Sequence, residues 1–143
     1  MGDFARNKDK VYGAIDLGSN NCRLLLARPH YDGFIVVDSF SRIVRLGEGV
    51  RHAGMLSDKA MARAIEALKT CRDKLSKYDV SRFRGVVTAA CREAKNGEIF
   101  LNRAYVEAGI KLEIVSDAEE AFLAFEGCSP LINNSVSNSL LFD

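Results

Sequence analysis

The stretch Asp16-Leu17-Gly18-Ser19-Asn20-Asn21 decides the fold of this chain, because it separates two apolar runs at residues 11–15 and 22–27. Two such runs joined by a short polar stretch predict a β-hairpin with a tight turn. Gly18 is expected to supply a backbone conformation that other residues avoid. Ser19 and the two asparagines offer polar side chains beside exposed backbone N–H groups, so the turn can hold a phosphate. The simpler interpretation is a hairpin turn without a ligand.

Asp16 favours the phosphate-binding interpretation, because it stands where the first predicted strand ends. A carboxylate beside a bound phosphate repels it unless a cation lies between the two charges. Carboxylate oxygens are ligands that Mg²⁺ accepts, directly or through water. The sequence therefore predicts that Asp16 anchors Mg²⁺ next to the turn.

The charge balance limits the classes of partner that we expect. Among 143 residues, 20 are basic and 19 acidic, which leaves a formal net charge of +1. A chain without a basic excess is not expected to bind nucleic acid non-specifically, so any anion site must be local. No apolar run is long enough for a membrane span, and no signal peptide is recognisable, so neither a membrane nor a nucleic-acid partner is expected.

The four cysteines are Cys22, Cys71, Cys91 and Cys128, and each lies in an apolar stretch without a C-x-x-C pair. This pattern is typical of small core residues rather than of disulfides or a metal site. A reducing cytoplasm is the expected location.

The order of elements predicts the fold class. Residues 1–10 are expected to be disordered or a lead-in, and residues 11–16, 22–29 and 33–46 to form three antiparallel strands with a turn at 30–33. A helix with Ser57 as its N-cap is expected to run to about Tyr78. The fourth and fifth strands are expected at 84–91 and 111–115, and the start of a sixth at 139–143. Further helices are expected at 98–108, ended by Gly109, and at 117–127. This order predicts an α/β domain at 11–143, a ribonuclease H-like mixed five-stranded sheet with its first strand in the centre.

Several basic residues are expected at the surface. Arg63, Lys69, Arg72, Lys74 and Lys77 are interpreted as the solvated face of the first long helix. Arg45 and Arg51 flank a Gly-Glu-Gly turn and could guide a polyanion, although plain surface placement is the favoured interpretation. His30 and His52 have no metal-ligand partners in the pattern and receive no role.

Two adjacent carboxylates near residue 116 receive different interpretations. Ser116 and Glu119 fit a capping box, which makes Glu119 structural. Ala121, Ala124, Phe125 and Cys128 are expected to form the buried stripe of that helix. Glu120 lies at the border of this stripe, where a carboxylate can face a cleft and accept a proton from water. The alternative is a solvated glutamate.

Five segments in a fixed order carry a resemblance to a known family. They read YGAIDLGSN at 12–20, VRLGEG at 44–49, LS at 56–57, TAACREA at 88–94 and IVSDAEEA at 114–121. Together they resemble the exopolyphosphatase and guanosine pentaphosphate phosphohydrolase family, which implies the actin, sugar kinase and Hsp70 superfamily of paired lobes. The family usually has Ser-Phe where this chain has Asn21-Cys22, so a hydroxyl contact at position 21 is not expected.

The resemblance implies functions for particular residues. Gly18, Ser19, Asn20 and Arg92 correspond to phosphate-binding positions, and Glu120 corresponds to the general base. Asp16 and Asp143 correspond to metal-anchoring positions, Asp143 being the first residue of a second Gly-rich loop. On residues alone, Arg92 could equally form a salt bridge with Glu93 or the neighbouring loop. Asp16 and Glu120 are expected to face one cleft.

The resemblance also implies a reaction, namely hydrolysis with Mg²⁺ of the terminal phosphate of inorganic polyphosphate or of guanosine pentaphosphate. Because the second loop and the second lobe are absent from the sequence, the chain is expected to be an N-terminal fragment that is inactive alone and needs the C-terminal lobe. The oligomeric state stays open, including a homodimer of the parent. The alternatives are a non-catalytic guanosine tetra- or pentaphosphate sensor and a lobe of a carbohydrate kinase.

Overall fold

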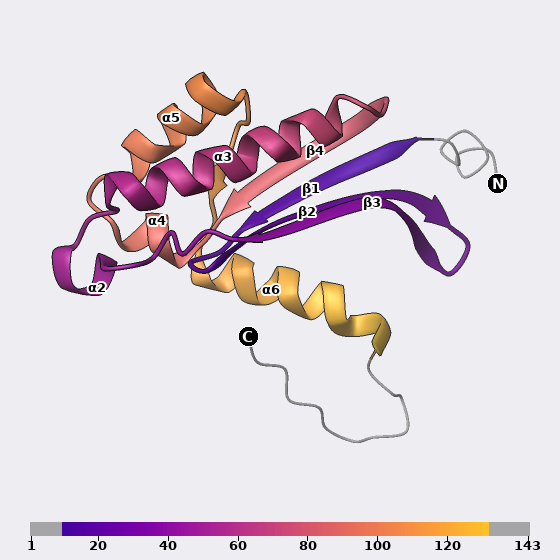
Figure 1. Cartoon of the computed structure of the whole chain (residues 1–143). Coiled ribbons are helices and arrows are strands. Elements are labelled where there is room, and N and C mark those ends of the chain that lie inside the picture. Colours follow the sequence, from indigo (N-terminus) through magenta and orange to yellow (C-terminus); the bar gives the residue numbers. More distant parts are fainter. Residues whose placement is uncertain (1–9, 132–143) are drawn as a thin grey trace, which may run out of the picture.

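A mixed five-stranded sheet forms the centre of the molecule (Figure 1). The structure is a computed structural model that describes residues 10–131. The strands are β1 (Val11–Leu17), β2 (Asn21–His30), β3 (Gly33–Ile43), β4 (Val80–Val87) and β5 (Glu113–Ile114). The helices are α2 (Val50–Ala53), α3 (Asp58–Leu75), α4 (Ala89–Glu93), α5 (Gly97–Ala108), α6 (Asp117–Cys128) and the short 3₁₀ helix η1 (Ser129–Leu131).

The strand order β3-β2-β1-β4-β5 places β1 in the centre of the sheet. Strands β1, β2 and β3 pair antiparallel, whereas β4 pairs parallel with β1 and β5 pairs parallel with β4. The parallel pairs are connected through α3 and α5, as parallel neighbours require. This arrangement confirms the predicted ribonuclease H-like class and the central position of the first strand.

Helices cover the two faces of the sheet unequally. In Figure 1, α3 and α5 lie on one face and α6 lies on the other. The core lies on the α3 side, where inward residues of β1 and β2 pack against one stripe of α3. The buried residues of that stripe are Ala60, Met61, Ala64, Ile65, Ala67, Leu68 and Cys71. Ser57 caps the helix by accepting a hydrogen bond from the Ala60 N–H at 3.2 Å, as predicted.

Two of the predicted strands end earlier than the sequence pattern indicates. The strand predicted at 84–91 is β4, which ends at Val87, and the chain then turns into α4. Small apolar residues such as Ala89 and Ala90 satisfy burial in either conformation, and alanine favours the helix. The strand predicted to reach residue 46 ends at Ile43, because the next two N–H groups turn back toward the β1–β2 loop.

The remaining boundaries differ by small amounts. Helix α3 ends at Leu75 rather than at Tyr78, and the strand predicted at 111–115 contains only Glu113–Ile114. Helix α2 has a single turn, which is too short to leave a periodic signal in the sequence. Gly109 ends α5 with a φ of 69°, as predicted. The strand predicted at 139–143 lies outside the described residues.

Three of the four cysteines occupy the core as expected, whereas Cys128 lies outside it and lines the cavity under α6. Cys22, Cys71 and Cys91 are buried, Cys128 is half-buried, and all four are free thiols. Cys22 Sγ lies 3.9 Å from Cys71 Sγ, across the contact between β2 and α3. Burial raises the pKa of Cys91 to about 12, so that thiol stays protonated and unreactive at neutral pH.

Candidate functional site

The predicted phosphate loop is the turn between β1 and β2. Leu17 pairs with Cys22, and the Gly18 N–H donates to the Asn21 carbonyl oxygen at 2.9 Å. The prediction that Gly18 has a special backbone conformation is wrong, because its φ is not positive. An added Cβ at this position would meet only the Asn21 carbonyl oxygen, at 3.7 Å. The turn therefore closes with ordinary backbone angles and leaves open space above Gly18.

The segment after β3 is bound to this loop through the backbone. The Asn20 carbonyl oxygen accepts from the N–H groups of Val44 and Arg45 at 2.8 and 2.9 Å, and the Ser19 carbonyl oxygen accepts from Gly47 N–H at 2.8 Å. Gly47 approaches the loop so closely that an added Cβ would lie 3.0 Å from the Ser19 Cβ. These contacts fix the shape of the phosphate loop from outside.

A cavity of about 750 Å³ lies between the sheet and α6. Asp16 reaches it from the end of β1, and Glu120 reaches it from the first turn of α6. The expectation that Asp16 and Glu120 face one cleft is therefore confirmed. The other polar residues that line the cavity are Arg23, Ser39, Ser41, Arg84 and Thr88.

Arg23 lines the cavity but was not among the predicted site residues, although the sequence pattern could have placed it there. It pairs with Asp16 in the β1–β2 register, and the two side chains form an ion pair of 3.7 Å between partly exposed groups. Once the hairpin turn is located, the alternation of strand residues places Arg23 on the same face as Asp16. Thr88 and Arg84 gave no such signal, because their positions depend on the parallel pairing of β4 with β1.

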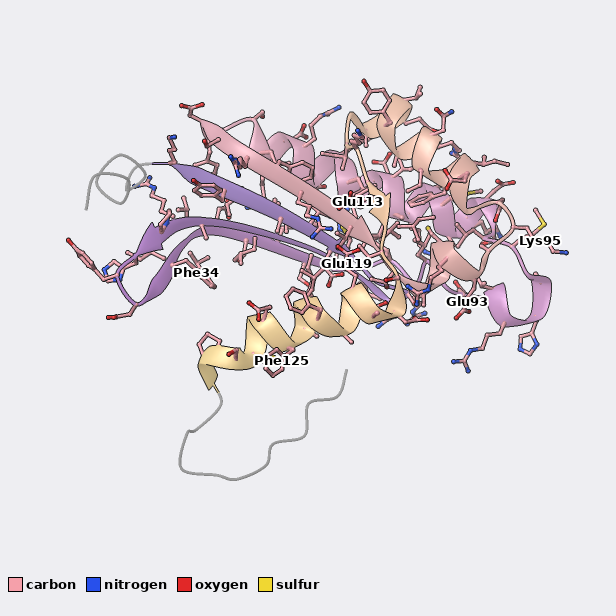
Figure 2. The ribbon with its side chains drawn as sticks, turned by 180° about the vertical axis from the view of Figure 1, so that it is seen from behind. Phe34, Glu93, Lys95, Glu113, Glu119 and Phe125 are labelled. Carbon is pink, nitrogen blue, oxygen red and sulfur yellow. The ribbon has the colours of Figure 1, made fainter. Side chains whose placement is uncertain are left out.

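Helix α6 presents a different face to the sheet from the one predicted. None of its residues is buried, and Phe125 of the predicted stripe is 49% exposed. Figure 2 shows Phe125 on the side of α6 that faces away from the sheet. The α6 residues that line the cavity are Glu120, Leu123, Ala124 and Cys128. This shift brings Glu120 from the border of the inward face onto that face, because the helix stands over a cavity rather than packing on the sheet.

Arg92, at the end of α4, connects the candidate base to the start of α6. Its guanidinium donates to the Val115 carbonyl oxygen at 2.7 Å and to Glu120 Oε2 at 3.3 Å, and it also pairs with Asp117. The salt bridge expected as the alternative function of Arg92 is present, but its partners lie on α6. A phosphate group would have to share this guanidinium with Glu120.

Glu119 has its own partner, which separates it from Glu120. Ser116 caps α6 by accepting from the Glu119 N–H at 3.2 Å, so this half of the predicted capping box is confirmed. The Glu119 carboxylate instead accepts from Arg84 at 2.5 Å, and Arg84 also donates to Glu113 at 2.6 Å (Figure 2). The hydrogen bonds from Glu119 and Glu113 raise the pKa of Arg84. Glu119 therefore ties α6 to the sheet, and only Glu120 faces the cavity.

The chemistry of a magnesium site is partly present in the described residues. Asp16 supplies one carboxylate to the cavity, which Glu120, the predicted general base, also lines. Within residues 10–131, no group of three or more acidic, histidine or cysteine side chains is close enough to hold a metal ion. Mg²⁺ commonly uses one or two carboxylates, with waters and substrate phosphates as the other ligands. The donor set therefore fits an ion bound together with its substrate, and Asp143 lies outside the described residues.

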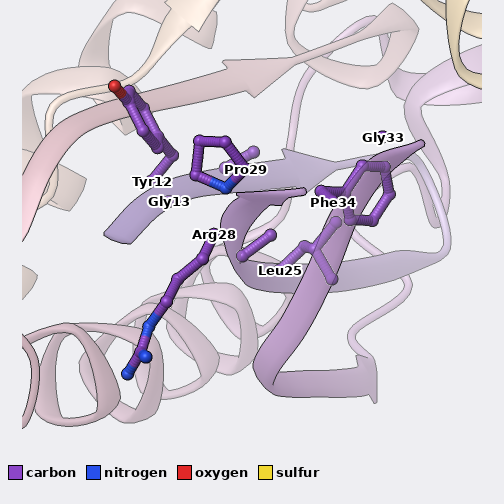
Figure 3. A pocket seen from close by; sticks show the side chains of 9 residues that line it. Tyr12, Gly13, Leu25, Arg28, Pro29, Gly33 and Phe34 are labelled. Atoms are coloured by element: carbon purple, nitrogen blue, oxygen red, sulfur yellow. The ribbon is translucent and has the colours of Figure 1, made fainter. Parts of the chain in front are cut away.

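A second hollow, of about 300 Å³, lies at the far end of the hairpins and contains none of the predicted site residues. Figure 3 shows Tyr12, Leu25, Pro29 and Phe34 around it. Phe34 is 61% exposed, so this end of the sheet is largely apolar and open.

Among the described residues, no helix is long and apolar enough to cross a membrane.

Comparison with known proteins identifies relatives. Residues 27–140 match the model of the Ppx/GppA phosphatase family. The chain is 33% identical over 117 residues to the guanosine-5'-triphosphate,3'-diphosphate pyrophosphatase of Photobacterium profundum, and this match covers 82% of the chain and 24% of the relative.

Solved structures of similar proteins have the same fold. A crystal structure of the Aquifex aeolicus member of the Ppx/GppA family matches with a TM-score of 0.78 and 29% identity, covering 85% of this chain and 40% of that protein. An exopolyphosphatase from Cytophaga hutchinsonii matches with a TM-score of 0.77 and 30% identity, covering 82% of this chain and 38% of that protein. The chain thus spans less than half the length of each of these relatives.

Proposed function

Because this chain belongs to the Ppx/GppA phosphatase family, we propose that it is the N-terminal lobe, at residues 11–143, of a phosphohydrolase. The parent protein removes terminal phosphate from inorganic polyphosphate or from guanosine pentaphosphate. The observation that carries this proposal is the cavity that holds both Asp16, at the start of the phosphate loop, and Glu120, at the start of α6. A second lobe completes the site, since the matched relatives are more than twice as long.

In this proposal Glu120 is the general base. A water molecule in the cavity gives a proton to Glu120 and attacks the terminal phosphorus. The anhydride P–O bond to the next phosphate of the substrate breaks, and the shortened polyphosphate or guanosine tetraphosphate leaves. The N–H groups of Ser19 and Asn20, beside Gly18, and the Arg92 guanidinium bind the oxygens of the transferred phosphoryl group. The Gly18 N–H closes the turn by donating to the Asn21 carbonyl oxygen. Arg92 also holds the Glu120 carboxylate, at 3.3 Å, which orients the base toward the cavity.

Asp16 is the residue of the described chain that would hold Mg²⁺, with Asp143 as the proposed second anchor. When bound, the ion neutralises charge on the phosphate oxygens. The Asp16 carboxylate lies beside Arg23, at 3.7 Å, so the loop has a positive charge available near its own carboxylate.

Both polyphosphate and guanosine pentaphosphate stay as proposed substrates, because the relatives are named for both reactions. One relative is named for a guanosine pentaphosphate reaction and another as an exopolyphosphatase. Of the proposed site residues, Asp16 and Glu120 line the cavity, whereas Ser19, Asn20 and Arg92 are not among the residues that line it. We propose that substrate selection resides mainly in the other lobe.

The test compares Glu120→Gln with Glu119→Gln in the full-length parent, using phosphate release from polyphosphate and from guanosine pentaphosphate with and without Mg²⁺. Glu120→Gln should lower kcat by about 10²-fold or more with little change in KM, as expected for loss of a general base. Glu119→Gln breaks only a partly exposed ion pair with Arg84, so turnover should stay near normal.

Three outcomes would contradict the proposal. A larger kcat loss for Glu119→Gln than for Glu120→Gln would show that the wrong carboxylate has been assigned. Binding of guanosine pentaphosphate without phosphate release would indicate a sensor. Release that requires both ATP and a sugar acceptor would indicate a kinase. Residues 1–143 alone should hydrolyse neither substrate, because they supply one of two phosphate loops.

A further inference from the structure

Two thiols that the proposed reaction does not use lie in contact inside the core. Cys22 Sγ and Cys71 Sγ are 3.9 Å apart, and both residues are fully buried. Cys22 is the second residue of β2, directly after the phosphate loop, and Cys71 lies near the end of α3. In the family that the chain resembles, position 22 is usually phenylalanine, so this thiol is not part of the family pattern.

The two thiols are close enough to be joined by a small movement. The sulfurs of a disulfide lie about 2 Å apart, so Cys22 Sγ and Cys71 Sγ must approach each other by about 2 Å. Rotation of the two side chains and a slight shift of α3 against β2 can supply this approach. Among the described residues, neither Cys91 nor Cys128 has another thiol within contact distance. The geometry therefore selects one pair of the four cysteines.

The two thiols also differ in acidity. The hydrogen bond with Cys22 lowers the pKa of Cys71, and the positive charges of Arg42 and Lys74 act in the same direction against the effect of burial. The hydrogen bond with Cys71 and burial raise the pKa of Cys22. Arg42 stands directly opposite Cys22 in the β2–β3 register. Because the thiolate is the reactive form, Cys71 is the thiol that an oxidant attacks first.

We propose that Cys22 and Cys71 are an oxidisable pair that forms a reversible disulfide with hydrogen peroxide. The Cys71 thiolate attacks one peroxide oxygen, the O–O bond breaks, and a sulfenic acid forms with release of one water after protonation. The Cys22 thiol then attacks the Cys71 sulfur, the S–S bond forms and a second water leaves. The peroxide thus takes up the two electrons that the thiols lose, and an added dithiol returns them.

The burial of the pair determines which oxidant fits. Hydrogen peroxide is close to water in size, so small fluctuations of the core can admit it. Oxidised glutathione is far larger, and its mixed disulfide with either cysteine would need space that a closely packed core does not have. We therefore expect peroxide to oxidise the folded chain and oxidised glutathione to leave it unchanged over the same period.

The disulfide would connect the strand that leaves the phosphate loop to α3. Cys22 pairs with Leu17 at the base of the loop, and the Gly18 N–H donates to the Asn21 carbonyl oxygen just before Cys22. Closing the distance between the sulfurs therefore moves the start of β2 relative to α3, beside residues 18–21. Oxidation should be felt at the loop whichever reaction the parent protein performs.

The test treats the folded 143-residue chain with hydrogen peroxide, blocks the remaining thiols with iodoacetamide in urea, and maps disulfides by mass spectrometry of peptides obtained without reductant. A peptide pair joining Cys22 to Cys71 should be the main product, and the free thiols should fall from four to two. Because the bond closes a loop of 49 residues, the Tm should rise by about 5 °C or more. Dithiothreitol should reverse both changes.

Two serine variants separate this pair from general oxidation. Cys71→Ser should abolish both the link and the rise in Tm. Cys91→Ser is the matched control, because it removes a buried thiol that has no thiol neighbour among the described residues, and it should keep both. Oxidation of the unmodified chain in urea, where other pairs can also form, gives a comparison that needs no folded variant. In ¹⁵N NMR spectra, the amide signals of residues 18–22 should move on oxidation of the folded chain.

Several results would overturn the proposal. The folded chain could keep four free thiols under conditions that oxidise it in urea, or give the same mixture of pairs as in urea. Cys71 could be oxidised to a sulfinic acid while Cys22 stays a free thiol, or the Tm could fall when the bond forms. Unchanged amide signals at residues 18–22 would reject the connection to the loop. None of these results bears on the proposed hydrolysis, which the Glu120→Gln variant tests separately.

Discussion

Replacing Asn96 by alanine should destabilise the chain by about 2–6 kcal/mol. Asn96 is 6% exposed, and its side chain forms two hydrogen bonds with the backbone of Leu56. Oδ1 accepts from the Leu56 N–H at 2.8 Å, and Nδ2 donates to the Leu56 carbonyl oxygen at 2.9 Å. Truncation leaves both backbone groups buried without partners, and each unpaired group costs about 1–3 kcal/mol. The expected loss is the sum of these two penalties.

Urea unfolding of the 143-residue chain, followed by circular dichroism, measures this loss. With an m-value of about 1–3 kcal/mol per molar urea, the midpoint should fall by about 0.7 M or more. Asn102→Ala is the matched control, because Asn102 is exposed within α5 and alanine favours the helix slightly. Its midpoint should stay constant or rise. A fall of less than about 0.5 kcal/mol for Asn96→Ala would refute the reasoning, since it would mean that water or a rearranged backbone satisfies Leu56.

Two further predictions concern the sheet edge and the α4–α5 connection. The hydrogen bond from Lys74 lowers the pKa of Asp38. The pair therefore stabilises the fold fully above the ordinary carboxyl pKa of about 3.9, and this stabilisation is lost as the pH falls through the lower pKa of the folded state. In an NMR titration the pKa of Asp38 should rise in Lys74→Gln, and an unchanged pKa would contradict the assignment. Gly97→Ala should lower the free energy of unfolding by about 1–3 kcal/mol, because the new Cβ would overlap the Cys91 carbonyl oxygen. In the control Gly127→Ala nothing lies within 4 Å of the new Cβ, so the variant should be neutral or stabilising. Urea unfolding measures both variants, and equal losses in the free energy of unfolding would refute the argument.

Features set by neighbouring residues could be predicted from the sequence. The hairpin turn, the Ser57 and Ser116 caps and the stop at Gly109 each depend on a few adjacent side chains. The alternation of strands and helices was then sufficient to predict the sheet and its central strand. The shared cleft of Asp16 and Glu120 followed from that topology.

Features set by distant contacts could not be predicted in the same way. Arg63 was expected on a solvated face, but it donates to the Val44 carbonyl oxygen and pairs with Glu48, both in the segment after β3. Lys74 likewise pairs with Asp38, on β3. No rule of spacing marks Arg45 for a positive φ, because the contacts that hold it come from Asn20 and Arg63. The inward face of α6 was mispredicted, because an apolar stripe was assumed to pack where a cavity lies.

The exposure of α6 has a consequence for how the proposed base is held. The helix has no fully buried residue. It is held by half-buried residues such as Leu123 and Ala124, and in part by the ion pairs of Arg84 with Glu119 and of Arg92 with Asp117 and Glu120. Such ion pairs weaken as ionic strength rises, whereas the apolar packing that holds β1 in the core is not screened by salt. The two halves of the site thus belong to different cooperative units. We expect amide hydrogens of the helix that carries Glu120 to exchange before those of β1, and to exchange faster as salt is added.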